Sequence, residues 1–272
     1  VNVESAHELR RLSALATGVE IPVALRVNRA GAGPDGSHRM TGVPTPFGID
    51  EAGLDPVIAL ARDLPGIDLV GFHLHAVSNN LDAAAHAAFL TDVVDWSRRT
   101  AERHGIDLRC INAGGGFGVD HTGGERFDLA TLAAGAPDDE RLVVEPGRLL
   151  AAYAGWYATE VIDLKTTHGR TFAVVRGGTH HFRLPAAWGY SHPFTVLARD
   201  RWPYRFDRPE VADVEVDAVG ELCTPRDVLT RGQHVSRLRI GDVLVFGTTG
   251  AYGWDISHHD FLRHPPPEFL IV

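Results

Sequence analysis

The chain carries the stretch AGGGFG at residues 113–118 and a second stretch, EPGR, at residues 145–148. Each follows a short apolar run, at 108–112 and 142–144, that is typical of a buried strand. Glycines at a strand end let backbone N–H groups approach an anion closely, because no Cβ intervenes. A carboxylate and a guanidinium at the next strand end supply partners for a cationic ring nitrogen and for a phosphate. Together the two stretches indicate a phosphorylated heteroaromatic cofactor.

The first half of the chain alternates between strand-like and helix-like segments. The strands are predicted at 1–3, 21–27, 67–75, 108–112 and 142–144, and the helices at 6–16, 51–64 and 81–104. Ser5 is placed to cap the first helix and Gly105 to end the last one, whereas 28–48 is a Gly/Pro-rich loop. This alternation predicts a parallel α/β architecture.

The second half, from about residue 153, is predicted to be an all-β domain. Its predicted strands are 156–164, 171–175, 214–219, 237–240 and 243–247. The last two flank Gly241-Asp242, which predicts a hairpin.

Composition excludes several classes of protein. The 272 residues suffice for two domains or for one barrel of about 250 residues. A net charge of −9 without a cluster of basic residues argues against nucleic-acid binding. The chain has no apolar stretch of membrane-spanning length and no signal-peptide pattern at its start. The only cysteines, Cys110 and Cys223, argue against a disulfide framework, so a reducing, cytoplasmic location is expected.

The sequence resembles the fold-type III pyridoxal-phosphate decarboxylases, the family of diaminopimelate and ornithine decarboxylases. The shared motifs, in order, are VES at 3–5, LRVN at 25–28, TG at 41–42, FGI at 47–49, GFHLHAVS at 71–78, the two stretches above, CTPRD at 223–227 and GAYG at 250–253. The resemblance implies pyridoxal 5′-phosphate as cofactor. It also implies an alanine-racemase-like (β/α)8 TIM barrel at 1–152, without its N-terminal strands, and a C-terminal β-domain at 153–272 that completes the site in a homodimer.

The resemblance implies a carboxy-lyase that acts on a small amino acid. Thr224-Pro225 follow Cys223 where the family usually has an acidic residue, and 177–185 reads GGTHHFRLP. Both features are most similar to the siderophore-biosynthesis branch, whose enzymes decarboxylate a citryl-diaminopropionate-type amino acid. The alternatives are a diaminopimelate or carrier-bound glutamate decarboxylase, a racemase of the same fold, and a catalytically dead homologue that regulates a true decarboxylase.

The Schiff-base lysine of the family lies on the first barrel strand, upstream of the segment that Val1 begins. Lys165, the single lysine, falls after the barrel and does not replace it. We expect either a further N-terminal part of the protein or a shortened product that needs another chain, and we favour the first.

The resemblance also assigns roles to individual residues. Cofactor contacts are expected from His75, Ser78, Gly114, Gly115, Gly116, Glu145, Arg148 and Tyr252. His75 would stack on the pyridine ring, and Glu145 would keep the ring nitrogen protonated. The glycine N–H groups, with Ser78, Arg148 and Tyr252, would bind the phosphate. Cys223 of the partner subunit would return a proton to the α-carbon.

Substrate contacts are expected from His180, His181, Arg183 and Asp227. Two of these assignments have structural alternatives: Asp227 can support the Cys223 loop instead, and Ser78 can be a helix N-cap instead of a phosphate ligand. Cys110 is expected to be a small residue inside a strand. The spacing of the histidines matches no ligand set, so no metal is expected.

Overall fold

The computed structural model describes residues 1–31 and 33–271. The chain forms two compact units, one of residues 1–119 with 126–149, the other of residues 120–125 with the chain from Leu150 onward. The division lies close to the domain boundary suggested after residue 152. No helix in the described residues is both long and apolar enough to cross a bilayer.

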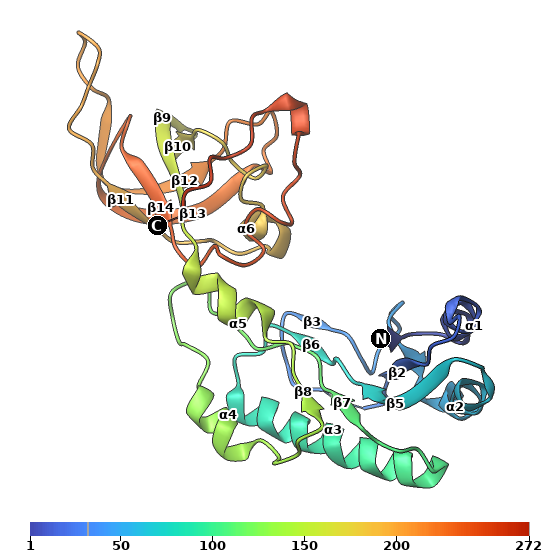
Figure 1. The fold of residues 1–272 in the computed structure, drawn as a ribbon. Helices are drawn as coiled ribbons and strands as arrows, with labels where there is room; N and C mark the ends of the chain where they lie inside the picture. Colours follow the sequence, from blue (N-terminus) through green and yellow to red (C-terminus); the bar gives the residue numbers. More distant parts are fainter. Residues whose placement is uncertain (32, 272) are drawn as a thin grey trace. The chain divides into compact units, whose positions relative to one another are not determined.

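The first unit is built on a parallel sheet with the strand order β1-β2-β5-β7-β8, and β4 pairs with the end of β2 (Figure 1). The elements are β1 Asn2–Val3, α1 Ala6–Leu15, β2 Ile21–Asn28, β4 Ile49–Asp50, α2 Leu54–Asp63, β5 Ile67–His73, α3 Ala83–His104, β7 Cys110–Asn112, α4 Leu129–Gly135, β8 Leu142–Val143 and α5 Gly147–Ala151. The parallel α/β architecture is confirmed. Among the described residues the strand path stays open at β1 and β8, so the closed barrel remains a prediction.

The core of this unit lies between the sheet and its helices. Leu25, Phe72 and Ile111 from β2, β5 and β7 are fully buried, and they share one apolar cluster with Leu9 of α1 and Val93 of α3. Burial of these side chains is the main force that holds the helices on the sheet.

The helix boundaries follow their capping residues. Ser5 Oγ accepts a hydrogen bond from the Glu8 N–H at 3.1 Å, and Gly105 ends α3 in the left-handed conformation at φ 61°, both as predicted. The helix predicted at 51–64 begins instead with a 3-10 turn, η1 Glu51–Gly53, before α2. The predicted loop at 28–48 contains a short strand, β3 His38–Arg39, that pairs with β6 Val77–Ser78.

The second unit consists mainly of strands, in the order β11-β14-β9-β10-β12-β13. Its elements are η2 Ala152–Ala154, β9 Tyr157–Thr167, β10 Arg170–Val175, α6 Leu184–Trp188, β11 Phe194–Leu197, β12 Glu210–Val219, β13 Val228–Arg239, β14 Val243–Phe246 and η3 Phe261–Arg263. The pair β10–β12 is parallel and the other pairs are antiparallel. A core around Val161, Phe182 and Phe246 fills the inside of this sheet.

The hairpin predicted around Gly241-Asp242 is wrong, because β14 pairs with β9 and β11 whereas β13 pairs with β12. The Gly241 N–H donates to the carbonyl of Val161 on β9 at 2.7 Å. The Val161 N–H donates to the carbonyl of Asp242 at 2.8 Å. These two bonds direct the chain onto β9 after the turn.

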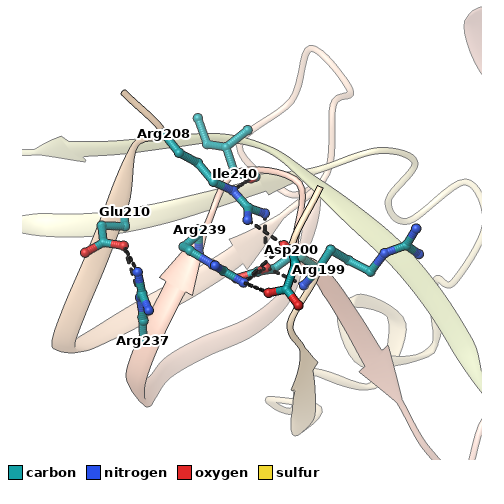
Figure 2. Close-up of polar contacts among 8 residues, drawn as sticks. Arg199, Asp200, Arg208, Glu210, Arg237, Arg239 and Ile240 are labelled. Carbon is teal, nitrogen blue, oxygen red and sulfur yellow. Dashed lines mark hydrogen bonds and ion pairs between the residues drawn. The ribbon is translucent and has the colours of Figure 1, made fainter. Parts of the chain in front are cut away.

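Arginine side chains hold this turn in place (Figure 2). Arg208 Nε donates to the carbonyl of Ile240 at 2.7 Å, and Arg239 Nη2 donates to the carbonyl of Arg199 at 3.1 Å. Both guanidinium groups also reach Asp242 Oδ1 at 3.1 Å. Burial alone would raise the pKa of Asp242, but hydrogen bonds from Arg239 and from the Arg199 backbone keep this pKa below its ordinary value.

Substituting Gly71→Ala is expected to destabilise the first unit. A Cβ at Gly71 on β5 would overlap the carbonyl oxygen of Cys110 on the neighbouring strand β7. Relieving that overlap is expected to lower the free energy of unfolding by about 1–3 kcal/mol. Urea unfolding followed by circular dichroism measures this loss. Gly53→Ala is the matched control, since nothing lies within 4 Å of its added Cβ. Equal stability of the two variants would contradict the prediction.

Candidate functional site

Polar side chains from four strands of the first unit gather at one edge of the sheet. Arg26 lies near the end of β2, His73 ends β5 and is followed by His75, Asn112 ends β7, and Glu145 follows β8. The carboxyl ends of parallel strands meet at the same edge, which is where α/β proteins bind their ligands.

Hydrogen bonds join the glycine turn to the residues around it. The Gly115 N–H donates to His75 Nδ1 at 3.1 Å, and the Gly114 N–H donates to Asn112 Oδ1 at 2.8 Å. Asn112 Nδ2 in turn donates to Glu145 Oε1 at 2.8 Å. The Glu145 N–H donates back to the carbonyl of Gly114 at 2.8 Å. His75, the glycine turn and Glu145 therefore form one connected network.

Each glycine of the turn stands where a side chain has no room. An added Cβ would lie 2.5 Å from His75 Nδ1 at Gly114 and 2.5 Å from the Glu145 carbonyl oxygen at Gly115. At Gly116 it would lie 2.5 Å from the carbonyl oxygen of Val77. Gly114 and Gly116 also have positive φ, at 68° and 102°. The turn is therefore restricted to glycine by its own packing.

The donors of this turn are not equivalent. The N–H groups of Gly114 and Gly115 already have partners in the network. Within residues 1–31 and 33–271, the structure records no hydrogen-bond partner for the Gly116 N–H. Of the predicted phosphate donors in the turn, Gly116 is thus the one whose N–H can bind an anion without breaking a bond already present.

The two histidines at the sheet edge are held neutral. Burial, and next the positive charge of Arg26, lower the pKa of His73 to about 4, with Glu145 opposing. The same two causes lower the pKa of His75, again opposed by Glu145. Because Nδ1 of His75 accepts the Gly115 N–H, its ring hydrogen is assigned to Nε2. An ion pair with Glu4 at 2.6 Å fixes the guanidinium of Arg26.

Ser78 and Arg148 also lie in the first unit. Ser78 is on β6, and its carbonyl accepts from the Ser37 N–H at 2.7 Å. The N-cap of α3 is Asp82, so the alternative of Ser78 as a helix cap is wrong. Arg148 is buried in the first turn of α5. Phosphate contacts of Ser78 and Arg148 remain predictions.

Asp227 organises a loop pair in the second unit. Its side chain is buried, Oδ1 accepts the Thr179 N–H at 2.6 Å, and Oδ2 accepts the Leu222 N–H at 2.9 Å. It thereby connects the 177–183 segment to the loop that carries the exposed thiol of Cys223. This geometry favours the supporting role of Asp227, and its contact with substrate remains a prediction.

The remaining predicted residues differ in exposure. Burial first, then the neighbouring His181 and His264, lower the pKa of His180 to about 4. His181 Nε2 donates to the carbonyl of Pro265 at 2.7 Å. Arg183 is exposed just before α6, and Tyr252 is exposed with a φ of 57°. The roles of these residues toward substrate and phosphate, and that of Cys223 as proton donor, remain predictions.

Two residues without a predicted site role lie as expected. Lys165 is an exposed residue of β9 that pairs with Asp163 at 3.4 Å. Cys110 is a half-buried residue of β7, and burial raises the pKa of its thiol.

Arg26, His73 and Asn112 belong to the site but were not identified from the sequence. Arg26 and Asn112 lie in segments that were predicted as buried strands, where a polar side chain needs a partner. Their placement in apolar strands was the available signal. Its meaning depends on Glu4 and Glu145, the partners that the fold brings to them.

Comparison with known proteins places these observations in a family. Residues 47–250 match the family described as "Pyridoxal-dependent decarboxylase, C-terminal sheet domain". The chain is 41% identical over 284 residues to 2-[(L-alanin-3-ylcarbamoyl)methyl]-2-hydroxybutanedioate decarboxylase of Staphylococcus aureus, with 100% of this chain and 71% of that protein covered. It is 34% identical over 261 residues to L-glutamyl-[BtrI acyl-carrier protein] decarboxylase of Niallia circulans, with 90% and 60% covered.

Solved structures agree with these relatives. A mutant diaminopimelate decarboxylase from Helicobacter pylori complexed with L-lysine superimposes with a TM-score of 0.80 at 25% identity, over 94% of this chain and 64% of that one. The sequence is also 31% identical to diaminopimelate decarboxylase of Streptomyces coelicolor, over 100% of this chain and 63% of that protein. The chain thus spans between 60% and 71% of the length of these curated relatives.

A buried histidine lies directly behind the glycine turn. His86 of α3 is fully buried, with its ring centroid 4.2 Å from that of Phe117 and 6.0 Å from that of Phe127. Neither ring nitrogen has a hydrogen-bond partner among the described residues. Burial, and to a lesser degree the nearby His75, lower the pKa of His86 to about 4.

Replacing His86 with leucine is expected to weaken the acid sensitivity of folding. Between pH 6.5 and about 4 the unfolded state binds a proton at His86 that the folded state does not, so stability falls as the pH falls. His86→Leu should therefore reduce the slope of unfolding free energy against pH by up to about 1.4 kcal/mol per pH unit. Urea unfolding across this range measures the slope. His7→Leu, at an exposed position on α1, should leave it unchanged. An unaltered slope in His86→Leu would rule the explanation out.

Proposed function

Because the chain belongs to the pyridoxal-dependent decarboxylase family, we propose that it is part of an amino-acid decarboxylase that uses pyridoxal 5′-phosphate. We propose as substrate a siderophore precursor of the citryl-diaminopropionate type. The observation that carries the proposal is the single network of His75, the glycine turn, Asn112 and Glu145 at the carboxyl edge of the sheet. The 41% identity to the decarboxylase of Staphylococcus aureus supports this substrate over the alternatives.

The residues at this edge fit the cofactor. The glycine turn lets backbone approach a phosphate where any Cβ would collide with the chain itself, and the Gly116 N–H can donate to the phosphate. His75 is neutral and can stack on an aromatic ring. Asn112 holds Oε1 of Glu145, so that Oε2 can accept a hydrogen bond from a protonated ring nitrogen.

When bound, the cofactor supplies an electron-accepting ring for the carbanion that loss of CO₂ leaves behind. Glu145 holds the proton on the ring nitrogen, and the Asn112 hydrogen bond fixes the carboxylate in that orientation. The exposed thiol of Cys223, supplied in a homodimer by the partner subunit, delivers a proton to the α-carbon. The closed eight-stranded barrel and the shared dimeric site are parts of this proposal.

Carbon dioxide release identifies the substrate. The protein is incubated with pyridoxal phosphate and, separately, with a citryl-diaminopropionate amino acid, diaminopimelate and carrier-bound glutamate. The first is expected to release CO₂ with the highest kcat/KM, in keeping with the relative of highest printed identity. Faster release from either of the other two would assign that substrate instead. Cofactor binding without CO₂ release from any of them would favour a regulatory homologue.

Glu145→Gln is expected to lower kcat strongly while leaving cofactor binding nearly unchanged. Glutamine keeps the size of the side chain and can still accept from Asn112, but it does not stabilise a protonated ring nitrogen by charge. Loss of such a preorganised electrostatic contact costs about 10²–10³-fold in rate. Kinetics of CO₂ release and cofactor titration separate the two effects. Glu140→Gln, an exposed acid on the same segment, should retain full activity. Equal kcat for the two variants would exclude this role for Glu145.

A further inference from the structure

Three metal-type ligands meet in the second unit. His180, Glu221 and His264 each present one ligand atom, and these atoms all lie within 4.8 Å of one another. We propose that these residues bind a divalent transition-metal ion such as Zn²⁺. This inference does not rest on the proposed decarboxylase activity, because it concerns the second unit alone.

His180 is the strongest single indication. Its side chain is only 3% exposed, and among the described residues neither ring nitrogen has a hydrogen-bond partner. Buried polar atoms without a partner are rare because they cost free energy, so such an atom calls for an explanation. The adjacent His181 shows the contrast, because its Nε2 donates to the carbonyl of Pro265. A metal ion would satisfy His180 in a way that the protein around it does not.

Glu221 is held in position from two sides. Its Oε1 accepts the Gly177 N–H at 2.7 Å, and its own N–H donates to the carbonyl of Gly177 at 2.9 Å. His264 Nδ1 lies 3.9 Å from the same Oε1. The side chains of Glu221 and His264 are 28% and 27% exposed, which leaves a path for an ion to enter from solvent.

The composition of the group favours a cation over an anionic ligand. The carboxylate of Glu221 would repel a substrate carboxylate at this position, whereas two imidazoles and one carboxylate are a ligand set that zinc accepts. Metal–ligand bonds of about 2.0–2.2 Å place the ligand atoms of a tetrahedral site about 3.4 Å apart. The observed separations reach that geometry with small side-chain rotations, and water would take the fourth position.

This inference replaces two expectations from the sequence. The absence of a metal was expected because the spacing of the histidines matches no ligand set, but the fold brings together residues 180, 221 and 264. His180 was expected to contact substrate, and here it becomes a metal ligand. The ion would fasten the segment that contains His264 to the loop that carries Cys223, because Glu221 lies in that loop.

Zinc titration tests the site directly. The full chain, purified without a histidine tag and freed of metal with a chelator, is titrated with ZnCl₂ by calorimetry. We expect one Zn²⁺ per chain and a rise in the melting temperature when zinc is added. His180→Ala and His264→Ala should each weaken binding by more than about 100-fold, and Glu221→Gln by about 10-fold or more. His234→Ala removes an exposed histidine of β13 that pairs with Asp213, and it should bind zinc like the wild type.

Two further measurements keep the test decisive. Circular dichroism establishes that each variant is folded, and His264→Ala, at a partly exposed position, replaces His180→Ala if the latter does not fold. Co²⁺ in place of Zn²⁺ should produce the visible absorption of a tetrahedral site in the wild type and lose it in His264→Ala. Wild-type affinity no higher than that of His264→Ala, or equal weakening by His234→Ala, would overturn the proposal.

Discussion

The candidate site depends on how closely the backbone of the glycine turn approaches its neighbours. Gly114 lies against the ring of His75, Gly115 against the backbone of Glu145, and Gly116 against the backbone of Val77. Residues with a Cβ at these positions would push apart the strand ends that carry the functional groups. The same close approach allows the hydrogen bonds through which Asn112 joins the turn to Glu145. Packing and chemistry therefore impose the same requirement on the sequence here.

That close approach requires a sheet that fixes β5, β7 and β8 side by side. Ile111 is fully buried in the centre of this arrangement and pairs with Leu142, while Gly71 lets β5 lie directly against Cys110. His86 and Phe117 pack behind the turn and support it from α3. The apolar core thus determines the positions of polar groups that make no apolar contact themselves.

The sequence predicts well those features that are determined locally. Ser5, Gly105 and the apolar runs before the two glycine-containing stretches mark helix ends and strand ends, and the structure places them there. Features that depend on distant partners escaped prediction. Gly241-Asp242 does form a turn, but the pairing of β14 with β9 depends on hydrogen bonds to Val161 that no local pattern encodes.

The site shows the same division between local and distant causes. Glycines, His75 and Glu145 could be found because their residue types at strand ends have a chemical meaning by themselves. Arg26 and Asn112 acquire theirs only through Glu4 and Glu145, which the fold brings within hydrogen-bond distance. For the same reason the grouping of His180 with His264 could not be read from their separation in the chain.

Charge at the sheet edge is arranged so that a positive ring nitrogen has one favourable place. Burial and the cation of Arg26 both disfavour protonation of His75, and the ion pair with Glu4 keeps that cation in position. A protonated His75 stacked on a protonated pyridine ring would place two like charges in contact. With His75 neutral, the carboxylate of Glu145 is the group that meets the positive charge of the ring. The Arg26–Glu4 pair therefore influences the proposed chemistry through the protonation state of His75, without touching the cofactor itself.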